Sequence, residues 1–202
     1  MGELPVPKRE ATKALNRQLI LEAARRVFAE LGYGATTVRD IIRQTGLASG
    51  TFYNYFRSKE EVHEAILDES AHRIRPRLRS ERLCAKTAEE FVRGTYRVFF
   101  EFVAADQRGF AVIRNQSIQP HVRMDTPEIL LAFGELRNDI DAAMARGVLP
   151  PVDSTYLMSA MAGIAFEVGN RMLERDPIDV EGATSFATAL VLGGLKTMKT
   201  SC

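Results

Sequence analysis

Apolar residues recur at three- and four-residue spacing along most of this chain, which is the spacing of a helix with one buried face. The first such helix is expected over residues 16–31, and Gly32 ends it. Another is expected over residues 59–74, because Pro76 should break or kink it. Alternating apolar runs joined by turn pairs are missing. The pattern therefore predicts an all-α fold.

The second half of the chain has the pattern of a bundle of longer helices that begins near Thr87. Its expected parts are an apolar stripe over residues 91–102, a short segment over 110–118, and helices over 127–146, about 153–174 and about 180–199. Gly147 and the following proline pair end the first of these three helices.

Residues 36–61 predict two short helices around a tight glycine turn. Thr37 is a good cap for the first helix, and Asp40 is placed to reach back to it as in a capping box. Gly46 follows that helix, at a point where a left-handed backbone is easily adopted only by glycine. The second helix then starts after a single short turn. Such a pair is typical of a helix-turn-helix that presses one short helix into a DNA groove.

The second of these helices has two unlike faces. Ser49 is expected to cap it, and Phe52 and Phe56 lie four residues apart on one side. Hydroxyl, amide and aromatic side chains from Thr51 to Tyr55 are left on or near the other side. The helix therefore has a face to bury and a polar face to offer to DNA.

Three stretches together carry a family resemblance: ILEAARRVFAELGYGATTVRDII, the run G-x-x-x-G-T-F-Y-x-Y-F from Gly46 to Phe56, and SKEEV. With them, residues 16–67 resemble the DNA-binding domain of the TetR (tetracycline-repressor-like) family of transcriptional regulators. The resemblance implies an N-terminal three-helix domain with a helix-turn-helix, followed by a larger C-terminal helical domain for ligand binding and dimerisation. It implies DNA contacts from Thr37, Arg39, Ser49, Gly50, Thr51, Tyr53, Asn54, Tyr55 and Lys59.

The implied contacts differ in kind. Arg39 and Asn54 can read bases, since arginine pairs with guanine and asparagine with adenine in the major groove. Lys59 would clamp a backbone phosphate, and the hydroxyls of Tyr53 and Tyr55 would bind phosphates. The alternative for the tyrosines is packing against the first helix.

The charge distribution suggests three parts. Residues 1–60 hold ten Lys and Arg against six Asp and Glu, although the whole chain has a formal net charge of only +1. A basic head on a mildly acidic body is typical of one DNA-facing domain. We expect a flexible basic arm over residues 1–15, the DNA-binding domain with its connecting helix over 16–75, and the helical ligand-binding and dimerisation domain over 76–202. Lys8, Arg9, Lys13 and Arg17 can add phosphate contacts, unless residues 1–12 are only a solvated tail.

Composition narrows the classes of function. The two cysteines and three histidines show no metal-ligand spacing, and the histidines are expected at the surface or at helix edges. Neither a glycine-rich phosphate loop nor a nucleophile elbow occurs, so no metal, no cofactor and no enzymatic activity are expected. No signal peptide and no membrane-spanning stretch are apparent, which favours the cytoplasm. A helical enzyme is the less favoured alternative.

The larger domain offers candidates for an effector site. Aromatic side chains are abundant there and buried charge is scarce, which favours an apolar or amphipathic ligand, including one with an acyl chain. The candidate lining is Phe99, Phe102, Phe110, Asn115, Phe133, Met161 and Phe166. These residues can equally be ordinary core. The arginine-rich stretch 73–82 is either a solvated connector or a groove for an anionic head group.

The last two helices are rich in Ala and Gly, which allow helices to approach closely. The resemblance implies that they form the interface of a two-fold homodimer, and an intramolecular core of small residues is the alternative. The sequence therefore predicts a ligand-responsive regulator, most simply a repressor, that binds a palindromic operator as a homodimer and is released by a small effector. Control by a protein partner is the second hypothesis.

Overall fold

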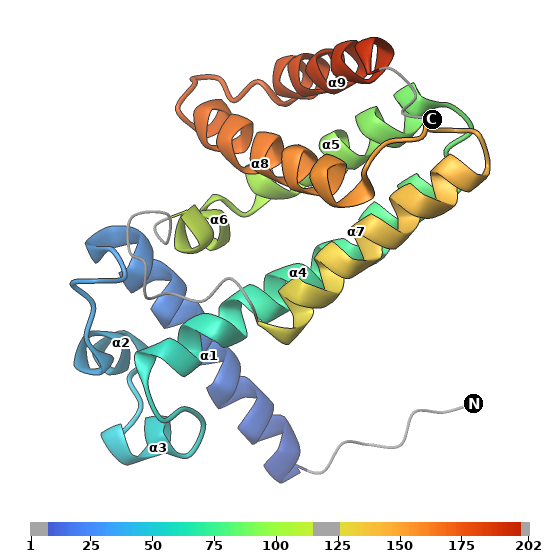
Figure 1. The fold of residues 1–202 in the computed structure, drawn as a ribbon. Helices are drawn as coiled ribbons and strands as arrows, with labels where there is room; N and C mark the ends of the chain where they lie inside the picture. Colours follow the sequence, from blue (N-terminus) through green and yellow to red (C-terminus); the bar gives the residue numbers. More distant parts are fainter. Residues whose placement is uncertain (1–7, 115–125, 199–202) are drawn as a thin grey trace. The chain divides into compact units, whose positions relative to one another are not determined.

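The computed structural model describes residues 8–114 and 126–198, and these fold into α-helices with no strand among them (Figure 1). The all-α prediction is confirmed. The helices are α1 Lys8–Leu31, α2 Val38–Thr45, α3 Ser49–Tyr53, α4 Lys59–Cys84, α5 Ala88–Ala105, α6 Gln107–Arg114, α7 Pro127–Ala145, α8 Ser154–Leu173 and α9 Val180–Thr197.

The chain divides into two compact units. The N-terminal unit comprises the residues up to Leu67 and the short stretch that begins at Ala111, and the C-terminal unit comprises Asp68–Phe110 and the residues from Met124 onward. Two helices, α4 and α6, therefore contribute residues to both units. The sequence did not predict that α6 would supply part of the N-terminal core.

The N-terminal core forms because α1, α2, α3, α4 and α6 each bury one apolar face in it. Its buried members come from these five helices, the α1–α2 loop and Phe56 after α3; they are Ile20, Leu21, Ala23, Ala24, Phe28, Tyr33, Ile41, Phe52, Phe56, Val62, Ile66 and Val112. Burying a large apolar side chain contributes about 1.5–3 kcal/mol. This core holds the helix-turn-helix in place.

Two helices are longer than the sequence predicted. The first begins at Lys8 rather than residue 16, so most of the expected flexible arm is helical. The fourth continues through Pro76 to Cys84, so of the two expected effects of Pro76, a break or a kink, the break is wrong. Pro76 removes one amide from the helix, but Pro76 and His72 are both exposed and water can bind the freed carbonyl.

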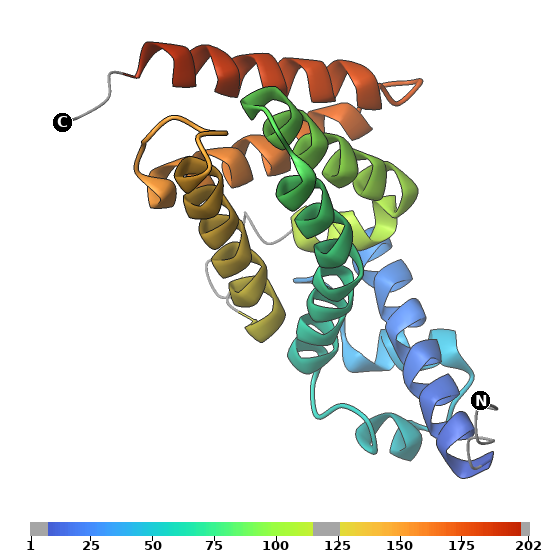
Figure 2. The same ribbon diagram turned by 90° about the vertical axis from the view of Figure 1, so that its right-hand side faces the viewer.

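In the C-terminal unit, α5 packs against α8 and α9, and α7 packs against α8 (Figure 2). The α5 helix is the centre of this packing, with Phe91, Val92, Tyr96 and Phe100 all buried. Asp153 caps α8 by accepting hydrogen bonds from the amides of Thr155 and Tyr156, 2.9 Å each. Within the described residues, none of the helices is both long and apolar enough to cross a lipid bilayer.

Candidate nucleic-acid interface and effector site

The helix-turn-helix begins with a complete capping box. The amide of Asp40 donates to Thr37 Oγ1 at 3.3 Å, and the amide of Thr37 donates to Asp40 Oδ2 at 2.9 Å. The hydrogen bonds from the Thr37 side chain and backbone hold the pKa of the Asp40 carboxyl below its usual value. The predicted cap and its partner are confirmed.

The turn depends on the conformation of Gly46, which has a φ of 68°. A Cβ built there would meet nothing within 4 Å, so the requirement for glycine comes from the backbone and not from crowding. The chain then enters α3 through Ala48, which makes no side-chain cap. Ser49 is the first residue of α3, so the expectation that Ser49 caps this helix is wrong. Its hydroxyl stays exposed beside the helix N-terminus.

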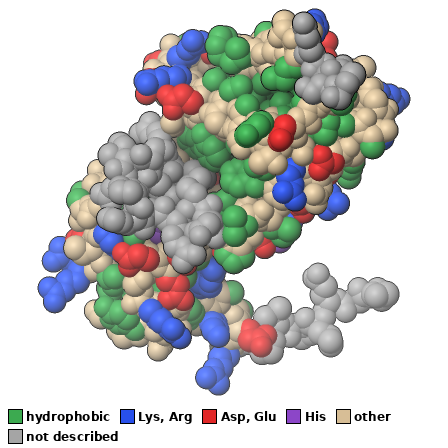
Figure 3. Space-filling model, in the orientation of Figure 1, with side chains coloured by type: hydrophobic (Ala, Val, Ile, Leu, Met, Phe, Trp, Pro, Cys, Tyr) green, Lys and Arg blue, Asp and Glu red, His purple; other side chains and the backbone are tan. Residues whose placement is uncertain are grey.

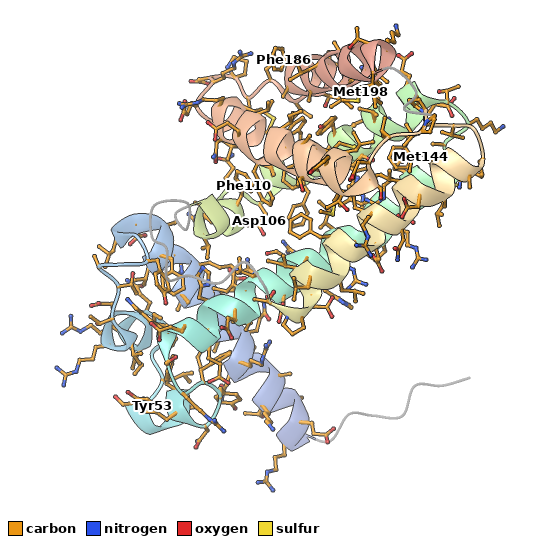
Figure 4. All side chains as sticks on the ribbon, viewed as in Figure 1. Tyr53, Asp106, Phe110, Met144, Phe186 and Met198 are labelled. Carbon is orange, nitrogen blue, oxygen red and sulfur yellow. The ribbon has the colours of Figure 1, made fainter. Side chains whose placement is uncertain are left out.

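The α3 helix turns its two faces as predicted. Phe52 is 1% exposed and Phe56 is 3% exposed, whereas Tyr53 is 59% exposed. Figure 4 shows Tyr53 at the outer edge of the N-terminal unit, pointing away from the other helices. The buried aromatic pair therefore presents the polar face of α3 to the outside, as a recognition helix requires.

The predicted DNA contacts fall into two groups by accessibility. Six of them are exposed: Thr37, Arg39, Ser49, Gly50, Tyr53 and Asn54. Thr51, Tyr55 and Lys59 are half-buried. Tyr55 packs against the N-terminal core, whereas Tyr53 does not. The exposed group lies in two short stretches, one at the start of α2 and one along α3 and directly after it.

Lys59 has structural contacts that the sequence did not reveal. Its ammonium donates to the carbonyl oxygens of Tyr33 and Thr36 at 2.9 Å each, and to that of Gly34 at 3.5 Å. It also lies 4.6 Å from the centre of the Tyr33 ring. An ammonium has three protons to donate. In this structure Lys59 therefore ties the start of α4 to the α1–α2 loop, and a phosphate contact would have to share or replace these bonds.

A buried histidine lies beside this loop. His63 is 1% exposed and its ring meets those of Phe28 and Tyr33 edge-on, with centroids 5.8 and 4.9 Å apart. Burial lowers the pKa of His63 to about 4, although a hydrogen bond with the Val112 backbone acts in the opposite direction. The expectation that the histidines lie at the surface or at helix edges is wrong for His63, because the α4 face that carries it is turned into the core.

In the C-terminal unit, aromatic rings from three helices meet. Phe99 of α5 lies edge-on to Phe110 of α6 and to Phe166 of α8, with centroids 6.1 and 5.5 Å apart. Phe110 and Phe166 are stacked at 6.2 Å. A Cβ added to Gly169 would lie 3.4 Å from the Phe110 ring. We call Phe99, Phe110, Phe166 and Gly169 the aromatic cluster.

The other effector candidates lie outside these ring contacts. Met161 is buried, and its carbonyl accepts a hydrogen bond from Tyr96 at 3.3 Å. Phe102 lies under the Arg73 guanidinium at 5.2 Å, and Phe133 is half-buried on α7. Asn115 lies outside the described residues. Tyr96 and Phe100 were not among the predicted lining residues, although both lie within residues 91–102 and their rings stack at 5.8 Å.

The arginine-rich stretch 73–82 is part of α4, the helix that contributes residues to both units. Its arginines bind carboxylates of neighbouring helices. Arg75 contacts Glu128 and donates to Glu135 through two nitrogens at 2.8 and 3.1 Å. Arg82 donates to Asp139 at 2.8 Å with both side chains buried, and Arg77 pairs with Glu101 at 2.9 Å. A groove of about 280 Å³ beside Arg75 and Arg79 also has Glu135 in its lining, so these positive charges are largely neutralised.

Known proteins share this helix-turn-helix sequence. The model of the bacterial regulatory proteins of the tetR family matches residues 20–66, which span the end of α1, the helix-turn-helix and the start of α4. Residues 20–66 therefore carry a DNA-binding domain of the TetR family of bacterial regulatory proteins. This match covers the capping box, the Gly46 turn and the Phe52–Phe56 pair, so the sequence resemblance is confirmed.

The relatives of this chain differ in how much of it they cover. The fatty acid metabolism regulator protein of Bacillus subtilis is 26% identical over 175 residues, which cover 77% of this chain and 90% of that protein. The HTH-type transcriptional repressor KstR2 of Mycolicibacterium smegmatis is 41% identical over 61 residues, 30% of each chain. The structure of the fatty acid degradation regulator FadR from Bacillus halodurans superposes with a TM-score of 0.78 at 25% identity, covering 96% of this chain and 99% of that one.

Another similar structure contains a ligand. FadR from Bacillus subtilis in complex with stearoyl-CoA superposes with a TM-score of 0.76 at 24% identity, covering 88% of this chain and 98% of that one. Both units of this chain therefore have counterparts of the same fold, and the described C-terminal helices belong to that shared architecture.

Proposed function

We propose that this protein is a homodimeric transcriptional repressor that leaves its operator when a long-chain acyl thioester binds in its C-terminal unit. The aromatic cluster carries the effector part of the proposal, because rings from α5, α6 and α8 meet there and the half-buried Phe99 and Phe166 can pack against an acyl chain. Relatives that regulate fatty acid metabolism, and a neighbour that holds stearoyl-CoA, support the same ligand class.

The exposed polar face of α3 supports the DNA part. Arg39 and Asn54 are accessible and can read base edges, while the hydroxyl of Tyr53 can bind a phosphate. The Thr37 hydroxyl donates to Asp40 Oδ2 at 2.6 Å, so a phosphate would have to replace that bond. Two recognition helices bind best at half-sites about 34–36 Å apart, so a two-fold dimer and a palindromic operator belong together.

The outer face of α8 and α9 supports a dimer interface. Tyr156, Phe186 and Leu190 are 77%, 60% and 52% exposed, and Figure 4 shows Phe186 on the outer side of α9. A Cβ added to Gly163 or Gly193 would meet nothing within 4 Å, so these glycines face open space and are not needed for packing inside one chain. Small residues between exposed aromatics are suited to the close approach of a second copy. Their position favours the dimer over an intramolecular core.

The effector can act through α4, which contributes residues to both units. Binding that favours one position of α4 changes the separation of the two recognition helices, and operator affinity falls. Linkage then requires that operator DNA weaken effector binding by the same factor.

The test begins with selection of bound duplexes from a random pool by the purified protein. The complex is then titrated with stearoyl-CoA, with a short acyl-CoA, with CoA alone and with stearate. Release by stearoyl-CoA but not by CoA alone supports the proposal. A complex that none of the four releases would overturn the effector part, and absence of any selected duplex would overturn the DNA part.

Two substitutions locate the effector. Gly169→Leu extends a side chain into the aromatic cluster and should weaken release at least tenfold while operator affinity stays unchanged. Gly169→Ala is the matched control, because its Cβ makes only ordinary contact with Phe110 at 3.4 Å. If stearoyl-CoA released both variants from the operator equally well, the aromatic cluster would not be part of the effector site.

The dimer has its own measurement. Gly163→Gln and Gly193→Gln should shift sedimentation toward the monomer, and Gly134→Gln on α7 is the control because it also meets open space. A monomeric wild-type protein, or dimers in all three variants, would contradict the interface.

A further inference from the structure

The α1 helix starts at Lys8, twelve residues before the family match begins at residue 20. Positions 9, 13 and 17 continue the series 20, 24 and 28 at the three- and four-residue spacing that places side chains on one face of a helix. Over residues 20–28 this face is apolar and buried in the N-terminal core. Before residue 20 the same face carries Arg9, Lys13 and Arg17.

The basic part of this face borders the recognition helix. The Arg17 guanidinium lies 5.5 Å from the centre of the Phe56 ring, and Phe56 is the buried aromatic that follows α3. In both Figure 1 and Figure 2, the N-terminal end of α1 lies at the same end of the N-terminal unit as α3. Arg17 is therefore the cation of this face that would lie nearest to a duplex bound by α3.

The three cations are not neutralised within the described part of the chain. Arg9, Lys13 and Arg17 are all exposed and make no ion pair with a described residue. Glu10 is the one acidic residue between positions 8 and 21. This contrasts with the arginines of α4, which bind carboxylates. Figure 3 shows basic side chains along the lower edge of the N-terminal unit.

We propose that Arg9, Lys13 and Arg17, here called the α1 basic stripe, bind backbone phosphates flanking each operator half-site. This inference rests on the proposed DNA binding and extends its footprint beyond the helix-turn-helix. Eight residues of helix span about 12 Å, which corresponds to three or four nucleotides along one strand. The stripe adds affinity without sequence preference, because phosphates are the same at every step.

The double variant Arg9→Gln/Lys13→Gln tests the stripe by the salt dependence of operator binding. Each lost phosphate contact lowers the slope of log K against log salt by about 0.9, so the slope of a dimer should fall by about 3 to 4. The ranking of duplex sequences should stay the same. Lys13→Arg keeps the charge and should behave as wild type.

Arg26→Gln is the matched control. Arg26 is exposed on the opposite side of α1, so its loss lowers the net charge without touching the stripe. The stripe would be overturned if the salt slope of operator binding were unchanged in the double variant. It would also be overturned if that slope fell by the same amount per lost charge in Arg26→Gln. In both cases the proposed DNA binding would stand. Wild-type protein that binds no duplex at low salt would instead overturn the proposed function. Duplexes trimmed to the half-sites should bind wild type and the double variant alike.

Discussion

The buried ion pair between α4 and α7 gives a sharp prediction about stability. Arg82 Nε donates to Asp139 Oδ2 at 2.8 Å, and the two side chains are only 3% and 7% exposed. Removing one partner leaves a buried charge without its counter-ion, which costs about 3–5 kcal/mol. Glu135 also attracts Arg82 electrostatically, so Asp139→Leu should fall near the lower end of that range. Arg82→Met should cost a similar amount.

The double variant Arg82→Met/Asp139→Leu should be within about 1 kcal/mol of the wild type, because two apolar side chains need no desolvated counter-charge. The assay is urea unfolding at one fixed protein concentration, followed by circular dichroism because the chain has no tryptophan. If the free energy of unfolding falls by about 2 kcal/mol per molar urea, each single variant lowers the urea midpoint by about 1.5 M.

The exposed pair Arg77–Glu101 is the control for this cycle. It starts from the same helix and has a similar distance of 2.9 Å, but its side chains are 56% and 44% exposed. Its coupling should be below about 1 kcal/mol. Single variants at residues 82 and 139 whose costs simply add in the double variant would refute the reasoning, since burial would then not couple the two charges.

Three further predictions concern the N-terminal unit. His63 has a folded-state pKa of about 4 against 6.5, so the unfolded chain binds the proton first, and stability present above pH 6.5 should fall by up to about 3 kcal/mol as pH drops to 4. Denaturation at several pH values checks this. The prediction would be contradicted if the unfolding free energy of the wild type changed with pH as steeply as that of His63→Leu, and no more. Lys59→Met should lower the free energy of unfolding by about 2 kcal/mol, because a charged donor to the Tyr33 carbonyl is lost. Unchanged stability with a smaller salt slope would instead make Lys59 a phosphate clamp only. Arg39→Ala and Asn54→Ala should each relax preference at one base pair, costing about 1–3 kcal/mol on the selected site, and a uniform loss on all duplexes would show that neither reads bases.

Much of the DNA-binding unit could be predicted because its signals are local. The Thr37–Asp40 box, the left-handed Gly46 and the Phe52–Phe56 pair each depend on residues within four positions of one another. Hydrogen bonds and steric limits over such short spans are set by the backbone of one helix turn. Periodicity likewise located the later helices to within a few residues.

Contacts between distant residues could not be predicted in this way. Lys59 binds a loop some 25 residues away in the sequence, and Arg75 meets Glu135 across 60 positions. Pro76 stays inside α4, and the arginines beside it find carboxylates on α5 and α7. From local sequence alone, Pro76 predicts a helix break and the arginines predict a solvated run of charge. In the folded chain, Pro76 is exposed to solvent and the arginines are paired with carboxylates.

The sequence by itself therefore determined that the chain is helical, where its helix-turn-helix lies and which face of α3 is polar, because short-range backbone geometry decides these features. Only the tertiary structure decided that His63 is buried, that Val112 completes the N-terminal core, and that Phe99, Phe110 and Phe166 meet. The physical reason is that burial and ring contact depend on which helix faces come together in space, and that is fixed by packing between elements far apart along the chain.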